Sequence, residues 1–444
     1  MIRCPHRPYR LHPFAVAVCA VLPLAAGCGG GSTTASKQGE VRLVNAAGDA
    51  GALDLYAGNA KIAAGVAAAS AGGYASIDAG TPTLAVRLAS SGASLASNAA
   101  TAVEKGKRYT VLAYASGGAV AETVLADAED APGGDTARLR VFNTASVEAG
   151  ALDAYLSATD CTALAASNAI ATNLAVAAPG AYATFGASAS GTPYRLCVTG
   201  AGDTGDLRLD LPLPLVRQQV TTVVLTATAG GVLVDATLVE QQGAVTARRN
   251  ASARLRLVAD AAGHATVGAT VNGVVLATAV GSPTVGAYAT VPAGALAASV
   301  LIGGVPVPLG ALSAAAGSDQ TLLVAGSAAA ATVALLADDN RRSTSTASPT
   351  RLRLVHGLNG LGDALTLDAN AKRVASNVAF GAASTPVNVA AASAVTLEVT
   401  APSLATPVYA ATGTAALALT AGNVYTLFML GDAGAPVPRL SQDR

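Results

Sequence analysis

Apolar and polar positions alternate in short runs along most of this chain. VRLVN at Val41–Asn45 and RYTVLAY at Arg108–Tyr114 are typical examples, rich in aliphatic and β-branched side chains. Gly, Pro, Asn and Asp separate such runs, which predicts short β-strands ended by turns. No window after the N-terminal region keeps a helical period of 3.6 residues over three turns. We therefore predict an all-β protein.

The same succession of strands recurs four times. Each copy opens with a strand that carries an arginine, and these arginines lie 98, 116 and 97 residues apart: Arg42, Arg140, Arg256 and Arg353. Six or seven short strands in about 95 residues are typical of a small immunoglobulin-like sandwich. The predicted fold is therefore a series of four tandem antiparallel β-sandwiches.

This pattern divides the chain into predicted parts. A signal peptide covers 1–27, a flexible tether covers 28–39, and the sandwiches, here called segments one to four, cover 40–128, 136–245, 253–340 and 350–440. Three stretches rich in polar or small residues are expected as linkers between the segments: 126–137, 241–253 and 338–350.

The first 27 residues have the features of an export signal. Arg3, Arg7 and Arg10 precede an apolar run of 11 residues at Phe14–Leu24, and small residues follow it. A membrane-spanning helix needs about 20 apolar residues, so this run is too short to span a bilayer. A buried N-terminal helix is the alternative interpretation.

The end of this region, Leu24-Ala25-Ala26-Gly27-Cys28, resembles a bacterial lipobox. The resemblance implies cleavage before Cys28 and attachment of lipid to that cysteine. Because Gly29 follows rather than an aspartate, it also implies sorting to the bacterial outer membrane, with the protein on the periplasmic or cell-surface face. Several acyl chains together anchor a protein firmly.

The other four cysteines are then accounted for. Cys4 and Cys19 leave with the signal, and Cys161 and Cys197 remain as an even pair in an oxidising compartment. We predict a disulfide between them, which would pin the extra residues of segment two around Cys161. A reactive or metal-binding pair is the alternative. It lacks CxxC spacing and has few histidines to help it.

The motifs of segment one, RLVNA, ALDLYAG, YASIDAGT and YTVLA, resemble a bacterial family called domain of unknown function 4397. The likeness is clearest in 41–113 and 350–430. Members of the family are mostly exported, often lipid-anchored and often tandem, so the resemblance implies the same organisation here. It implies no activity.

Composition and candidate chemistry narrow the function. Charged residues make up 12% of the chain, with 27 bases against 27 acids and no basic stripe, which argues against nucleic-acid binding. His264 and His356 occupy different places in their segments, and Asp54 and Asp153 share a strand position without a catalytic partner. Acidic loops at 128–135 and 201–210 match no calcium-loop spacing. We expect no catalytic residue, cofactor or metal.

These observations predict a lipid-anchored, non-enzymatic protein of the bacterial cell envelope that acts by surface contact, as a scaffold, an adhesin or an organiser of the envelope. Its expected partners are the membrane and an envelope or surface protein. The alternative is a binding module for a carbohydrate, a peptide or a small ligand. The absence of Trp and the 4% aromatic share speak against a polysaccharide surface. A hydrolase ranks third.

Overall fold

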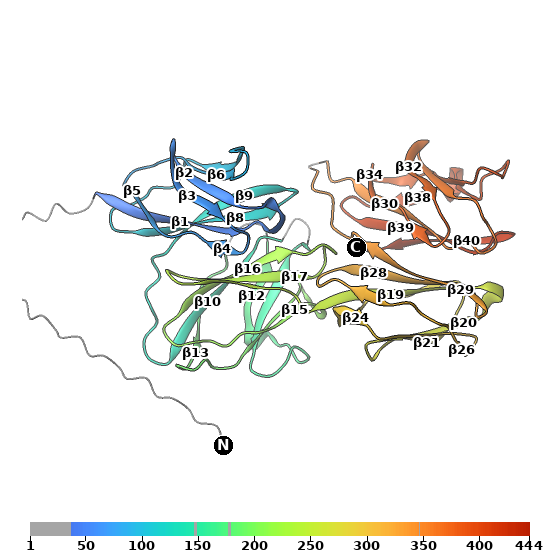
Figure 1. The fold of residues 1–444 in the computed structure, drawn as a ribbon, viewed down its shortest axis with the longest axis horizontal. Coiled ribbons are helices and arrows are strands. Elements are labelled where there is room, and N and C mark those ends of the chain that lie inside the picture. Colours follow the sequence, from blue (N-terminus) through green and yellow to red (C-terminus); the bar gives the residue numbers. More distant parts are fainter. Residues whose placement is uncertain (1–36, 146–148, 176–178, 346) are drawn as a thin grey trace, which may run out of the picture. The chain divides into compact units, whose positions relative to one another are not determined.

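The strands of this chain pair into small sheets that recur along the sequence (Figure 1). The computed structural model describes residues 37–145, 149–175, 179–345 and 347–444. The predictions for the signal peptide, Cys28 and most of the tether lie outside these residues. Residues 37–444 form one compact unit. It is all-β, as the alternating pattern predicts. No helix in the described ranges is long and apolar enough to cross a membrane.

The strands and short helices follow in chain order, grouped by the predicted segments. Segment one contains β1 (Gln38–Ala46), η1 (Gly48–Ala50), β2 (Leu53–Ala57), β3 (Ala60–Val66), β4 (Ser70–Ala71), β5 (Ala75–Asp78), β6 (Leu84–Leu88), β7 (Ser94–Asn98), β8 (Arg108–Ser116) and β9 (Ala119–Ala126). Segment two contains β10 (Thr136–Asn143), β11 (Leu152–Ser157), η2 (Ala166–Asn168), β12 (Ala169–Leu174), β13 (Ala183–Gly186), β14 (Arg195–Gly200), β15 (Asp203–Pro212), β16 (Val220–Ala227), β17 (Val234–Glu240) and β18 (Val245–Arg248).

The second half of the chain repeats this order. Segment three contains β19 (Ser252–Ala261), η3 (Ala262–His264), β20 (Thr266–Val271), β21 (Val274–Gly281), β22 (Thr284–Val285), β23 (Ala289–Pro292), β24 (Gly294–Leu296), β25 (Ala298–Ile302), β26 (Val305–Pro306), β27 (Leu312–Ala314), β28 (Asp319–Ser327) and β29 (Ala330–Asp338). Segment four contains β30 (Thr350–His356), β31 (Leu365–Ala369), β32 (Lys372–Val378), β33 (Ala382–Ala383), β34 (Val387–Val389), β35 (Ala392–Val395), β36 (Leu397–Thr400), β37 (Tyr409–Ala411), η4 (Gly413–Ala415), β38 (Leu417–Leu419), β39 (Val424–Asp432) and β40 (Ala435–Gln442).

One sheet in each segment is built around the strand that carries the arginine. That strand (β1, β10, β19 or β30) pairs in parallel with a late strand (β8, β16, β28 or β39), which then pairs antiparallel with the strand after it. Each segment therefore contains one parallel pair, where the prediction was antiparallel throughout. The parallel pair arises because the chain leaves this sheet, builds the other one and returns by a long connection.

The second sheet of each segment is antiparallel and covers the first. In segment one its order is β3-β2-β6-β7, and in the blue part of Figure 1 β2, β3 and β6 lie above β1 and β8. The core between the two layers is aliphatic. Leu43, Leu53, Leu55, Leu84 and Val111 are completely buried there.

Two stretches that the sequence predicts as linkers are partly strand. β18 lies inside 241–253 and extends the sheet of segment two, because Val245–Arg248 pairs antiparallel with β17. Asp338, at the start of the third predicted linker, is the last residue of β29 and is buried. Segment four also runs past its predicted end at 440, since β40 ends at Gln442.

Candidate functional site

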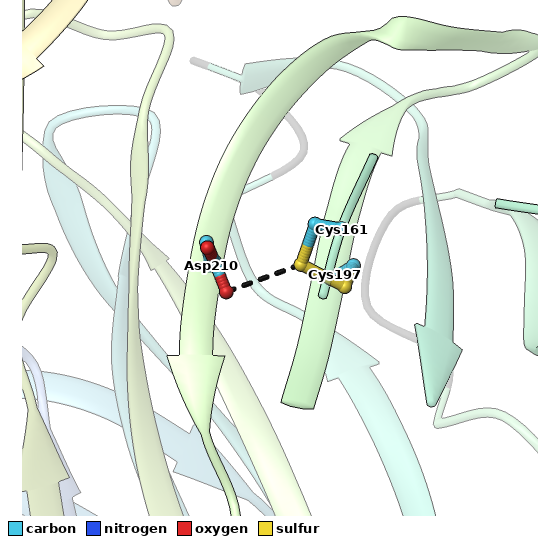
Figure 2. Close-up of side chains that lie close together, drawn as sticks. All are labelled: Cys161, Cys197 and Asp210. Carbon is cyan, nitrogen blue, oxygen red and sulfur yellow. Dashed lines mark hydrogen bonds between the residues drawn. A yellow bond between two sulfur atoms is a disulfide. The ribbon is translucent and has the colours of Figure 1, made fainter. Parts of the chain in front are cut away.

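The structure brings Cys161 and Cys197 together as a disulfide. Their Cα atoms are 5.6 Å apart, and the bond ties the loop after β11 to β14 (Figure 2). Both cysteines are buried, with 7% and 0% of their surface exposed. The residues added to segment two are thus held against its second sheet. Cys28, the predicted lipid attachment site, lies outside the described residues.

A carboxylate lies beside this disulfide. Asp210 Oδ1, on β15, is 3.1 Å from Cys161 Sγ (Figure 2). The same oxygen accepts a hydrogen bond of 2.6 Å from Arg195 Nε. The three residues are close enough to hold a metal ion only if both sulfurs are free thiolates. A disulfide offers no thiolate, and the Arg195 guanidinium already neutralises Asp210. The arrangement is that of a structural bridge.

The conspicuous histidine and aspartates of the sequence are held by backbone groups. His356 is fully buried; the Leu358 N–H donates to its Nδ1, and Nε2 lies 3.1 Å from the Asp363 carbonyl oxygen. Burial lowers the pKa of His356. Asp54 accepts the Gly65 N–H at 2.8 Å, and Asp153 accepts backbone N–H groups in the same way. These contacts order loops and leave His356 inaccessible.

A larger polar network surrounds the arginine of each segment. Every arginine donates from Nε to the threonine opposite it on the parallel partner strand, at 2.8–2.9 Å: Arg42 to Thr110, Arg140 to Thr222, Arg256 to Thr321 and Arg353 to Thr426. Three of these threonines donate in turn to an aspartate on the last strand or just after it: Thr110 to Asp127, Thr321 to Asp338 and Thr426 to Asp443. The register places Gln241 at this position in segment two.

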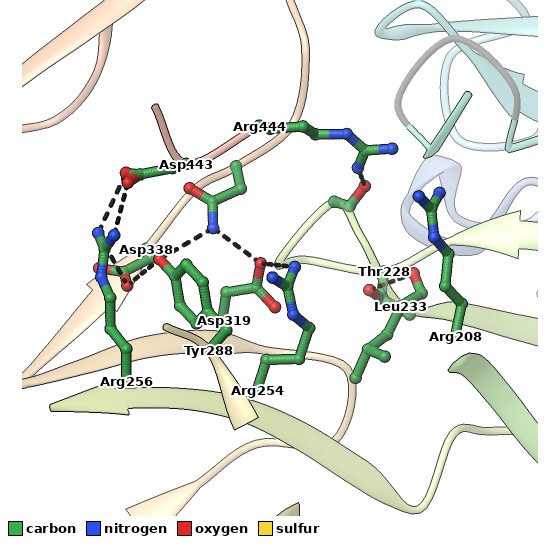
Figure 3. Close-up of polar contacts among 12 residues, drawn as sticks. Arg208, Thr228, Leu233, Arg254, Arg256, Tyr288, Asp319, Asp338, Asp443 and Arg444 are labelled. Atoms are coloured by element: carbon green, nitrogen blue, oxygen red, sulfur yellow. Dashed lines mark hydrogen bonds and ion pairs between the residues drawn. The ribbon is translucent and has the colours of Figure 1, made fainter. Parts of the chain in front are cut away.

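Segments three and four exchange their arginines through this network. Arg256 donates from Nη1 to Asp443 Oδ1 at 2.5 Å, and Arg353 donates from Nη2 to Asp338 Oδ1 at 2.6 Å. Figure 3 shows Arg256 between Asp443 and Asp338. All four side chains are at most 2% exposed. Burial alone lowers the pKa of the Arg256 guanidinium, but Asp443 and its other neighbours outweigh burial and raise it. The exchange is reciprocal, because each segment supplies the arginine of one ion pair and the aspartate of the other.

The corresponding arginine of segment one, Arg42, also contacts a neighbouring segment, but its partners are backbone carbonyls of segment two rather than carboxylates. Arg42 donates from Nη1 to the Gly243 carbonyl and from Nη2 to the Glu240 carbonyl, both at 2.8 Å. An apolar cluster with side chains from both segments also joins them: Val44, Ala46, Leu112, Tyr114, Leu125, Phe142, Val224 and Val239. A smaller cluster joins segments three and four: Val258, Leu323, Val355, Phe428 and Leu430. The arginine-bearing sheets of segments one and two therefore pack against each other through their outer faces, and those of segments three and four do the same.

The end of the chain adds a contact with segment two. Arg444, labelled in Figure 3, donates to the carbonyl oxygens of Gly231 and Ala149 of segment two; Ala149 is not labelled in that view. Burial, together with the nearby Arg208, Arg342 and Arg254, lowers the pKa of Arg444 to about 9. Asp319 lies close by and accepts from Arg254 at 3.1 Å.

Part of this chain matches the model of a known protein family. Residues 39–155 match the family described as Domain of unknown function (DUF4397). The matched region covers segment one and runs into β11 of segment two. No curated protein matches the chain. The match supports the sequence resemblance for this region, and the family's description records no activity to compare with the networks above.

The sequence shows the four arginines but not their role. Their regular spacing identifies the first strand of each segment, yet each arginine could equally have faced solvent. The signal that was available is an arginine between aliphatic residues on a strand whose neighbours are buried, because a buried charge must be paired. The carboxylate partners lie in stretches that resemble solvated linkers.

One buried carboxylate between segments three and four predicts a pH effect. Burial, with a smaller contribution from nearby Asp432, raises the pKa of Asp260 to about 7, although Asp260 accepts the Gly431 N–H at 2.8 Å and His264 also acts to lower it. Between about pH 4 and pH 7 the Asp260 carboxyl therefore stays protonated in the folded chain but is ionised in the unfolded chain. The free energy of unfolding consequently falls as the pH rises through this range. Asp260→Asn should flatten that fall.

The measurement is urea unfolding of both proteins at pH 4 and pH 8. Asp260→Asn keeps an oxygen that accepts the Gly431 N–H but carries no charge at either pH. The free energy of unfolding of the variant, minus that of the wild type, should therefore be larger at pH 8 than at pH 4. An equal difference between the proteins at both pH values would contradict the assignment.

Proposed function

We propose that this chain is a lipid-anchored, non-enzymatic protein of the bacterial cell envelope that acts by surface contact. The observation that carries the proposal is the use of its buried charges. Arg42, Arg256 and Arg353 join one segment to another, and polar groups that could have served catalysis, such as His356, are bound to backbone. Such a body suits scaffolding, adhesion or envelope organisation.

The lipobox motif at Leu24–Cys28 supports the anchor, and the strand pairing common to all four segments supports tandem copies of the matched family. We further propose that the anchor lies in the outer membrane, with Cys28 as the lipidated first residue and the segments on the periplasmic or cell-surface side. Partners would then be envelope or surface proteins.

The test is fractionation of cells that express a Cys28→Ala variant. Without the cysteine no lipid can be attached, so the protein should move from the detergent-soluble membrane fraction to the soluble fraction or stay as uncleaved precursor. Cys19→Ala is the matched control, because Cys19 lies in the predicted signal and should leave the anchor intact. Metabolic labelling with a fatty acid should give a signal for wild type and Cys19→Ala. Labelled Cys28→Ala in the membrane fraction would refute the anchor.

A further inference from the structure

Among the described residues β40 lies at the edge of its sheet, whereas its counterpart in segment two, β17, is covered by β18. In the described part of the chain β40 has one neighbouring strand, β39, whereas β17 has β16 on one edge and β18 on the other. The registers align the two strands, because Thr222 pairs with Val239 and the corresponding Thr426 pairs with Ser441. β18 covers Ala236–Val239, and the corresponding stretch of β40 is 438–441.

A groove lies along this uncovered stretch of β40. Its volume is about 510 Å³, and it is lined by Arg439, Leu440 and Ser441 from β40 and by 283–287 around β22. In segment one the residues equivalent to 283–287 are 69–73, because Gly72 and Gly286 make the same backbone hydrogen bond to the arginine-bearing strand. β4 at 70–71 lies against β18 there. The groove is therefore the position that β18 fills between segments one and two.

The backbone of β40 is open to a strand at one place. Glu240 donates its N–H to the Ala244 carbonyl at 3.0 Å, so Glu240 and alternate residues before it face β18. The corresponding residues of β40 are Gln442, Leu440, Pro438 and Pro436. Both prolines lack an N–H, which protects the first half of the edge. Leu440 and Gln442 keep theirs, next to the groove.

The side chains of the groove select what can bind. Arg439 is exposed and makes no ion pair with the described residues, and it occupies the place of Thr237, which pairs with Ala247 of β18. Ser441 occupies the place of Val239, which pairs with Val245. Val285 of the groove wall replaces the smaller Ala71. A strand seated here would meet the Val285 side chain first and, two residues later, the Arg439 guanidinium, which forms no ion pair with the described residues.

We propose that this groove binds an extended strand of a partner protein, aligned antiparallel to β40, with an aliphatic residue opposite Ser441 and a carboxylate opposite Arg439. The backbone of Leu440 supplies hydrogen bonds, and the carboxylate forms a cross-strand ion pair. The strand extends the sheet of segment four just as β18 extends that of segment two. This deepens the proposed function by naming the kind of partner that the surface contact recognises.

The test uses the purified full chain and fluorescently labelled peptides derived from the sequence of 243–250. The sequence GAVTETTN carries glutamate at the Ala247 position, GAVTKTTN carries lysine there, and GAVPETTN replaces Thr246, whose backbone faces β17, by proline. We expect fluorescence anisotropy to show that the glutamate peptide binds about threefold tighter than the lysine peptide, the size of a cross-strand charge pair. The proline peptide should bind roughly tenfold more weakly, because it loses a backbone hydrogen bond.

Two variants locate the binding. Arg439→Glu changes an exposed side chain and should reverse the preference between the glutamate and lysine peptides. Leu440→Pro removes the outward N–H and should weaken both peptides roughly tenfold. Leu335→Pro is the matched control, because Leu335 is the equivalent residue of β29, away from the groove, and should leave peptide binding unchanged.

Equal binding of the glutamate and proline peptides would overturn the proposal, as would binding that survives Leu440→Pro. Self-association that Leu440→Pro abolishes, without peptide binding, would assign the groove to a second copy and overturn it as well. The assay is done in solution on purified protein, so it does not depend on the lipid anchor. A failed peptide test and a failed Cys28→Ala test are therefore distinguishable.

Discussion

Arg353→Ala should lower the free energy of unfolding by about 3–5 kcal/mol, the cost of breaking a buried ion pair by removing one partner. Arg353 is 1% exposed and donates to Asp338, to Thr426 and to the carbonyl of Ala337. Its loss leaves the Asp338 carboxylate buried between two segments without its nearest cation. Urea unfolding, followed by tyrosine fluorescence because the chain has no Trp, measures the change.

The matched control is Arg140→Ala. Arg140 holds the same position in segment two but is half-buried; its guanidinium donates to Thr222 at 2.9 Å and stacks 4.4 Å from the centre of the Tyr182 ring. Removing it should cost about 1 kcal/mol, the size of a single hydrogen bond. If Arg353→Ala costs no more than Arg140→Ala, segments three and four do not depend on the exchanged ion pairs.

Removal of the disulfide should have an effect of similar size. The double variant Cys161→Ala/Cys197→Ala opens a loop with a sequence separation of 36 residues, which by chain entropy lowers the free energy of unfolding by about 3–4 kcal/mol. The effect should be confined to segment two, because the bridge joins the loop after β11 to β14. Urea unfolding with and without dithiothreitol measures it, and mass spectrometry of non-reduced peptides identifies the bond.

Asp210→Asn is the control for this pair. It removes the charge 3.1 Å from Cys161 Sγ and the ion pair to the partly exposed Arg195 but leaves the disulfide, so the change should stay within about 1 kcal/mol. An unfolding curve of the wild type that dithiothreitol does not shift would contradict a structural bridge. Tight zinc binding by the reduced protein would favour the alternative of a metal-binding pair.

The local pattern of this sequence predicts strands better than it predicts their partners. Alternation in VRLVN and RYTVLAY predicts β1 and β8 as strands, and the structure contains both. Their parallel pairing is missed, because it joins Arg42 to a residue 68 positions later and no turn connects the two. Pairings set by long connections depend on tertiary packing, which local propensity does not encode.

The missed parts of the site have a similar cause. β18 lies in a stretch rich in Gln and Arg that resembles a linker, and its strand conformation depends on the edge of β17. Asp338 stands before a run of charged residues that suggests solvent, yet it is buried by segment four. The pairing of Cys161 with Cys197 could be predicted from the sequence, because counting cysteines needs no knowledge of the fold.

The exchange of arginines also bears on the order in which the chain folds. Arg256 lies near the start of segment three, but the carboxylate that it binds, Asp443, comes 187 residues later. A chain that emerges from its N-terminus must therefore complete segment three with Arg256 near Asp338 alone, and without its shorter ion pair to Asp443 until β40 has formed. Contacts of such large sequence separation slow folding. We therefore expect docking of segments three and four to be a late step of folding, because both arginines and both aspartates must be in place before the two ion pairs can form.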